Sequence, residues 1–277
     1  MEEHISRITQ WFNHLFGPLA LRLYHDLLHI QPKDFENPVP EYVVMSLLVL
    51  LIGTLLVLVL RSRLSVERPG ASQQIAELLL TNPMGFGIRD LLEENVAHGA
   101  EKYIAFTGSV AIFVLLANLL SVIPAFTSPT AYAVVPLACA VLTFIYFNWQ
   151  GIRHHGFGGY LLTFAGSPKQ LGDWVLALLL FPVELISTAA RILSLTVRLW
   201  ANMFASELIY VIFIGLLMKP FEWGWSKNYA LGGFLWIFTA FIPLLFIGLH
   251  MFVSIIQAYI FTVLPSIYIG LAVADEH

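Results

Sequence analysis

The segment LSLTVRLWANMFASEL, Leu193–Leu208, decides the fold because it places Arg198 in the middle of long apolar runs. A guanidinium does not lose its proton in proteins, so at bilayer depth it is costly and usually functional. One simpler interpretation is that Arg198 snorkels to the headgroups, but the apolar runs extend well beyond it on both sides. Another is an ion pair with Glu207, but nine residues place Glu207 about 180° around the helix. Arg198 is therefore available to a carboxylate on another molecule.

The composition indicates a membrane protein. Of the 277 residues, 58% are hydrophobic and 12% are charged, whereas soluble domains average about 45–50% and 25%. The mean hydropathy is +0.78, and apolar stretches of spanning length predict helices rather than a barrel. The net charge of −4 and the lack of a basic patch argue against a nucleic-acid partner. The single cysteine, Cys139, excludes an internal disulfide.

We predict an all-α integral membrane protein with about five membrane crossings and additional amphipathic helices at the surface. The predicted crossings are residues 41–60, 103–123, 131–149, 173–218 and 230–273. Residues 1–40 are predicted to form an extramembrane or interfacial segment, with a surface helix over 6–30, and residues 41–277 the membrane domain. Residues 71–100 are typical of a second surface helix that is interrupted at Asn82 and Pro83.

Basic residues set the expected orientation. The arginines that directly follow the first crossing are Arg61, Arg63 and Arg68. The positive-inside rule therefore places residues 61–100 in the cytoplasm and the N-terminus outside. By the same rule the loop predicted over residues 150–172, which carries Arg153 and Lys169, is cytoplasmic, as is the C-terminus.

The last two crossings are longer than a bilayer requires. Helices over residues 173–218 and 230–273 would be about 69 and 66 Å long, whereas the bilayer core needs about 30 Å. Each is either two short helices with a hidden break or one steeply inclined helix. We favour a long, strongly tilted hairpin over residues 173–273, because its prolines can kink a helix but do not resemble loops. Its outer turn is predicted over residues 219–229.

This hairpin contains several polar side chains away from its ends, namely Glu184, Arg191, Arg198, Asn202, Glu207, His250 and Gln257. On a helical wheel Arg191 lies about 20° from Arg198, and Asn202 and Glu184 each lie about 40° from it, so these four form one polar stripe. Glu207 stands on the opposite side. His250 and Gln257 are seven residues apart and share one face of the second helix.

Two interpretations of these groups remain open. The first is an ion pathway, in which Glu207 and His250 exchange protons. The second is a structural network of polar side chains that hold two helices together. The combination of a basic stripe with a separate acid and imidazole favours transport.

Other function classes receive less support. A secondary antiporter or a flagellar-type stator would show internal repeats or broken half-helices, and no convincing repeat is found. A membrane-embedded enzyme could use His154, His155 and Glu184 as metal ligands, but their spacing lacks an HExxH signature. His25 and His29 are four residues apart without a third ligand. We therefore predict no metal and no cofactor.

The same residues resemble the arginine helix of subunit a of F-type ATP synthases. The matching run is SLTVRLWANM at residues 194–203, followed by ASEL at 205–208. Three further segments are similar: Asn118–Leu120 with Pro124 and TSPT at 127–130, PVELIS at 182–187, and His250 with IQAYIF at 256–261. The resemblance covers about residues 40–273.

The resemblance implies a stator proton-channel subunit of a bacterial plasma membrane, with no catalytic centre of its own. Two offset half-channels would exchange protons with a carboxylate on a rotating ring of c subunits. The implied partners are this c ring, the b-subunit peripheral stalk, the remainder of the ATP synthase and membrane lipid. The ATP chemistry would lie in other subunits, since the chain has no GxxxxGK[ST] pattern.

The resemblance also assigns roles to residues. Arg198 is the arginine that faces the ring carboxylate, with Gln257 across from it. Glu207 and His250 line the outer half-channel, and Glu184 belongs to the inner one. Asn202 shares the polar stripe, and Arg191 is a second barrier of lesser importance. The chain departs from the family in having Ala201 and Ser206 where glycine is common. It also has no acid near Asn118, which leaves the access to its outer channel undefined.

Overall fold

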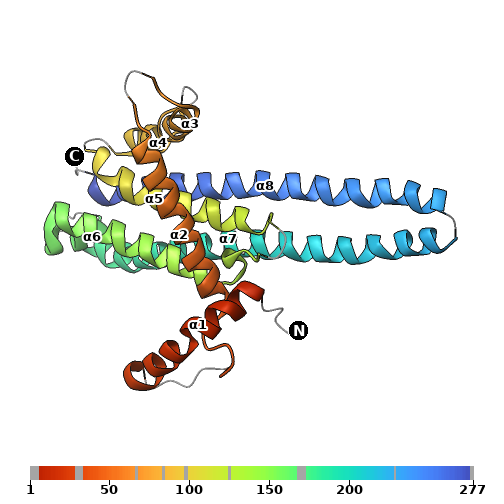
Figure 1. The fold of residues 1–277 in the computed structure, drawn as a ribbon. Helices are drawn as coiled ribbons and strands as arrows, with labels where there is room; N and C mark the ends of the chain where they lie inside the picture. The colour runs from red at the N-terminus through yellow and green to blue at the C-terminus, as the bar shows by residue number, and fades with distance from the viewer. Residues whose placement is uncertain are drawn as a thin grey trace. The chain divides into compact units, whose positions relative to one another are not determined.

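The computed structural model describes residues 6–28, 34–65, 68–82, 85–96, 99–123, 126–166, 173–227 and 229–274, and within these ranges it contains helices and turns but no strand. The elements are α1 (Arg7–Leu23), the π-helical turn η1 (Tyr24–Leu28), α2 (Glu41–Ser62), α3 (Ala71–Leu80), α4 (Ile88–Asn95), α5 (Glu101–Leu120), the 3₁₀ turn η2 (Pro129–Ala131), α6 (Val134–Phe164), α7 (Asp173–Lys227) and α8 (Tyr229–Val273) (Figure 1).

Within the residues that the structure describes, five helices contain segments long and apolar enough to cross a bilayer. These segments are Glu41–Ser62, Glu101–Leu120, Val134–Phe164, Trp174–Ile209 and Leu244–Val273. They correspond to the five crossings predicted from hydropathy. The prediction of an all-α integral membrane protein is thus confirmed.

The two long helices α7 and α8 are each continuous through the residues described. The alternative of short helices with a hidden break is therefore wrong, whereas the inclination of the hairpin to the membrane stays a prediction. The predicted turn over residues 219–229 is also wrong, because α7 continues to Lys227 and α8 begins at Tyr229. Hydropathy falls in this region, but a helix satisfies its own backbone hydrogen bonds and can continue past the end of an apolar run.

The predicted loop over residues 150–172 is wrong in its first half, since α6 is helical to Phe164. The helix bends sharply at Gly156, whose φ of 74° and ψ of 163° favour glycine. After the bend, the hydroxyl of Tyr160 donates a hydrogen bond to Oδ1 of Asn148 at 3.0 Å. The Tyr160 ring also lies where a Cβ on Gly151 would stand. The segment after Gly156 therefore packs back on the preceding helix; residues 167–172 lie outside the described ranges.

The predicted interruption between two surface helices is confirmed around Asn82, because α3 ends at Leu80 and α4 begins at Ile88. The Asp90 carboxylate accepts hydrogen bonds from the backbone N–H groups of Asn82 (2.7 Å) and Gly87 (3.2 Å). These bonds fix the start of α4, since the first N–H groups of a helix lack partners within it.

Contacts along the chain define two compact units. Unit 1 comprises Met1–Ile52, Leu115–Val135 and Leu199–Ile256, and unit 2 comprises Gly53–Val114, Pro136–Arg198 and Gln257–His277. The core of unit 2 is formed by Ile88, Leu92, Val96, Ala100, Tyr103, Phe147, Tyr160, Ile269 and Ala272.

In unit 1, Asn13 ties the N-terminal helix to the following segment, because its amide donates to the Val39 carbonyl (3.0 Å) and accepts from the Val39 N–H (2.9 Å). The division of the chain at residue 40 stays a prediction.

Candidate functional site

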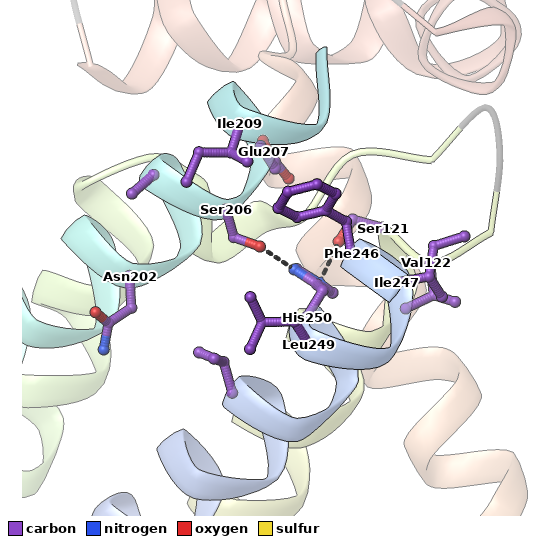
Figure 2. A pocket seen from close by; sticks show the side chains of 12 residues that line it. Ser121, Val122, Asn202, Ser206, Glu207, Ile209, Phe246, Ile247, Leu249 and His250 are labelled. Carbon is purple, nitrogen blue, oxygen red and sulfur yellow. Dashed lines mark hydrogen bonds between the residues drawn. The ribbon is translucent and has the colours of Figure 1, made fainter. Parts of the chain in front are cut away.

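A cavity of about 200 Å³ in unit 1 brings together three of the residues predicted to form a site, Asn202, Glu207 and His250. Its walls come from α7, α8 and the turn that follows α5 (Figure 2). At about 30 Å³ per molecule, this volume has room for several waters. The cavity is therefore suited to moving a proton between polar side chains among apolar surroundings.

The imidazole of His250 is held on both of its nitrogens. Nδ1 lies 2.5 Å from the Ser206 hydroxyl, and Nε2 lies 2.9 Å from the Ser121 hydroxyl (Figure 2). Nε2 also lies 3.0 Å from the Asn118 carbonyl oxygen. A carbonyl oxygen only accepts, so Nε2 carries the hydrogen in the bond to Asn118. In the neutral ring Nδ1 then accepts from Ser206, and in the charged ring it donates to the same hydroxyl. His250 is thus able to gain and lose a proton at Nδ1 without changing its position.

The carboxylate of Glu207 is half-buried, and its Oε1 accepts a hydrogen bond from the backbone N–H of Ser128 at 3.0 Å. Ser128 is itself fixed, since its hydroxyl donates to the Ala117 carbonyl at 3.0 Å. The prediction that Glu207 and His250 lie near each other is consistent with their shared cavity. No direct hydrogen bond joins the two among the residues described.

In unit 2 the structure pairs two groups of the predicted polar stripe. The Arg191 guanidinium donates to Oε1 of Glu184 at 2.9 Å, and its Cζ lies 5.3 Å from the centroid of the Tyr268 ring. A carboxylate and an aromatic face both stabilise a guanidinium. Both charged residues line a cavity of about 270 Å³. The charge of Arg191 is therefore largely compensated within the chain.

Arg198, unlike Arg191, has no carboxylate partner among the described residues. Its side chain is only partly buried and forms no ion pair or hydrogen bond with any residue that the structure describes. Gln257, in the same unit, is 2% exposed, and its buried Oε1 has no hydrogen-bond partner among the described residues. No hydrogen bond joins Arg198 and Gln257 among the described parts of unit 2. A cation without a counterion and an acceptor without a donor are thus both present in this unit.

The sequence did not identify Ser121 or Ser206 as partners of His250. Ser206 attracted notice only as a replacement for glycine, and Ser121 not at all. Ser121 lies 129 residues and Ser206 lies 44 residues from His250 in the chain, and the Asn118 carbonyl lies 132 residues away. A serine in an apolar segment gives no signal of the distant group that it contacts.

The metal-binding alternatives gain no support from the structure. Among the described residues, no group of three His, Cys, Asp or Glu side chains is placed to hold a metal ion. His154 and His155 lie on α6 with their ring centroids 4.8 Å apart. His29 lies outside the described residues.

Comparison with known proteins gives a consistent result. The family model described as "ATP synthase A chain" matches residues 42–270. The chain is 42% identical over 241 residues to "ATP synthase subunit a" of Solibacter usitatus (strain Ellin6076), which covers 87% of this chain and 90% of that protein. It is 35% identical over 275 residues to "ATP synthase subunit a" of Koribacter versatilis (strain Ellin345), covering 99% of both chains. A protein of the same description from Geobacter sp. (strain M21) is 30% identical over 259 residues, 94% of this chain and 98% of that one.

Proposed function

This chain belongs to the ATP synthase A chain family, and from that membership we propose that it is the stator subunit that exchanges protons with a rotating ring of c subunits. It is an integral membrane component of an ATP synthase. Its proposed task is to offer two offset half-channels and a fixed cation between them. A b-subunit peripheral stalk would hold it still, and the ATP chemistry would take place in other subunits.

The observation that carries this proposal is the contrast between the two arginines of α7. Arg191 has a carboxylate at 2.9 Å, whereas Arg198 has no counterion among the described residues. An unpaired guanidinium at membrane depth is costly unless a charge from elsewhere compensates it. A carboxylate carried past by the c ring would supply this charge.

The mechanism follows from the electrostatics of Arg198. A ring carboxylate must be neutral where it faces lipid, and it ionises beside Arg198 because the fixed positive charge favours the carboxylate form. The same charge repels a proton that would pass directly between the half-channels. Protons therefore travel with the ring. Each elementary charge that crosses 100 mV supplies about 2.3 kcal/mol for rotation.

The two cavities suit the two half-channels. We assign the unit 1 cavity, with Glu207, His250 and Asn202, to the outer half-channel and the unit 2 cavity, with Glu184 and Arg191, to the inner one. The N-terminus would lie outside and the C-terminus in the cytoplasm of a bacterial plasma membrane. Gln257, whose buried Oε1 has no hydrogen-bond partner among the described residues, would face Arg198 across the path of the ring carboxylate.

Affinity purification separates this proposal from a secondary antiporter. The tagged chain, extracted in mild detergent, should bring with it a c ring, a peripheral stalk and a nucleotide-hydrolysing head. A chain that purifies alone while its vesicles still exchange ions would support the antiporter and contradict the proposal.

The ion pair of Arg191 leads to a separate prediction. Arg191→Gln should retain measurable ATP-driven proton pumping, within about fivefold of wild type, because the charge that it removes is already compensated by Glu184 and Tyr268. Fluorescence quenching of a pH-sensitive dye in vesicles that carry the whole complex measures this rate. Complete loss of pumping in an assembled Arg191→Gln complex would show that Arg191 is as essential as Arg198.

A further inference from the structure

Glu41 is a buried carboxylate that the proposed mechanism does not use. It is the first residue of α2, it is 8% exposed, and its Oε1 accepts a hydrogen bond from the Thr127 hydroxyl at 3.0 Å. No cation pairs with it among the residues described. Burying an ionised carboxylate is costly unless it is paired or well hydrogen-bonded, and one hydroxyl compensates little of that cost. Glu41 is therefore a buried acidic side chain whose charge no described ion pair compensates.

Glu41 and Glu207 are held by adjacent residues of one segment. Thr127 donates its hydroxyl to Glu41, and the next residue, Ser128, donates its backbone N–H to Oε1 of Glu207 at 3.0 Å. The two carboxyl groups come from α2 and α7 and are 166 residues apart in the printed sequence, so only the fold brings them together.

The segment between the two carboxyl groups is itself fixed. The Ser128 hydroxyl donates to the Ala117 carbonyl at 3.0 Å and lies 2.6 Å from the Thr130 hydroxyl oxygen. Thr130 in turn donates to Oδ1 of Asn118 at 2.5 Å. Ser128 and Thr130 are both fully buried. The distance between Glu41 and Glu207 is therefore set by a hydrogen-bonded frame rather than by a loose loop.

We propose that Glu41 is a proton-carrying residue of the outer half-channel, placed before Glu207 on the route to His250. This inference rests on the proposed function and supplies the acid that the sequence lacks near Asn118. The protonated carboxyl of Glu41 gives its proton, by way of the Thr127 hydroxyl and water, to the Glu207 carboxylate. Glu41 is left as a carboxylate and takes its next proton from the outer aqueous phase.

Substitution at position 41 can separate proton transfer from hydrogen bonding. Glu41→Gln keeps an oxygen that accepts from Thr127 but cannot carry a proton. We expect it to reduce proton flux at least about fivefold in assembled complexes, the low end of what proton transfer by a positioned side chain contributes. Glu36→Gln is the matched control, because Glu36 precedes the same helix and is exposed. It should leave the flux unchanged.

A relocated carboxyl provides the converse test. The double variant Glu41→Gln with Thr127→Asp places the carboxyl at position 127 instead of position 41, so the hydrogen-bonded pair again contains one group that can carry a proton. It should recover at least half of the proton flux that Glu41→Gln loses. A merely structural role for Glu41 would not be rescued in this way. Glu41→Asp and Glu41→Asn form a second pair that differs only in the ability to carry a proton, and the aspartate variant should conduct at least about fivefold faster.

The experiment is ATP-driven and potential-driven proton flux in vesicles that contain the whole complex, with assembly quantified and Glu207→Gln as reference. Loss of flux in Glu41→Gln with recovery in the relocated variant supports the proposal. Wild-type flux in Glu41→Gln, with no flux in Glu207→Gln, overturns the role of Glu41 alone. Wild-type flux in Glu207→Gln would instead contradict the proposed function. If Glu41→Gln does not assemble, the aspartate and asparagine pair decides, and equal flux in these two overturns the proposal.

Discussion

Arg198→Ala and Arg198→Lys are both expected to abolish ATP-driven proton pumping by the assembled complex, to below about a tenth of the wild-type rate. Alanine removes the charge that draws the ring carboxylate into its ionised form. Lysine begins with a charge, but an ammonium that is desolvated can lose its proton, and it lacks the planar fork that binds a carboxylate through two hydrogen bonds. The measurement is dye quenching in vesicles on addition of ATP, with the rate of ATP hydrolysis recorded in parallel.

Arg191→Gln serves as the control in this experiment, because it removes a positive charge from the same helix two turns away. The alternative of a snorkelling or structural arginine predicts a different pattern, in which Arg198→Lys behaves as wild type. Pumping at the wild-type rate by assembled Arg198→Ala complexes would exclude Arg198 from the mechanism.

The exchange of Glu207 and His250 should have the second-largest effect. Glu207→His and His250→Glu are each expected to reduce proton flux at least about tenfold, because each breaks a proton-transfer step in the unit 1 cavity. The double variant should conduct better than either single one. The Ser206 and Ser121 hydroxyls can donate to a carboxylate at position 250, and the Ser128 N–H can donate to an imidazole nitrogen at position 207.

Flux is compared among the two single variants, the double variant and wild type at equal amounts of assembled complex. A structural network would respond differently, because two disruptive changes in one network would lower assembly further rather than restore conduction. A double variant that is as inactive as the worse single one would remove support for a relay between Glu207 and His250.

The membrane helices were predictable because hydropathy records which segments can lie in lipid. The break near Asn82 was also predictable, since a proline follows it directly. Hydropathy does not record where a helix ends, so the continuation of α7 to Lys227 was not predictable from it. The helical segment that follows Gly156 was missed for a related reason. It is stabilised by the contact of Tyr160 with Asn148, and a glycine-rich stretch gives no sign of that contact.

Some residues of the candidate site were predictable because an ionisable side chain in lipid is energetically costly and therefore conspicuous in an apolar stretch of sequence. Glu207 and His250 are conspicuous in apolar helices, and they line one cavity. The pairing of Arg191 with Glu184 follows from their spacing of two helical turns. Glu41 escaped notice because it stands at the first position of a predicted crossing, where an acid is ordinary at a helix start. Its partner Thr127 lies 86 residues away in the chain.

The central claim is that Arg198 separates two half-channels, and passive proton permeability without ATP tests it most directly. Vesicles that carry the whole complex with Arg198→Ala should leak protons when a potential is imposed, because the barrier between the half-channels is gone. Adding Glu207→Gln to the same chain should close this leak, since it blocks one half-channel. Absence of a leak in Arg198→Ala vesicles, or a leak that Glu207→Gln does not reduce, would contradict the account.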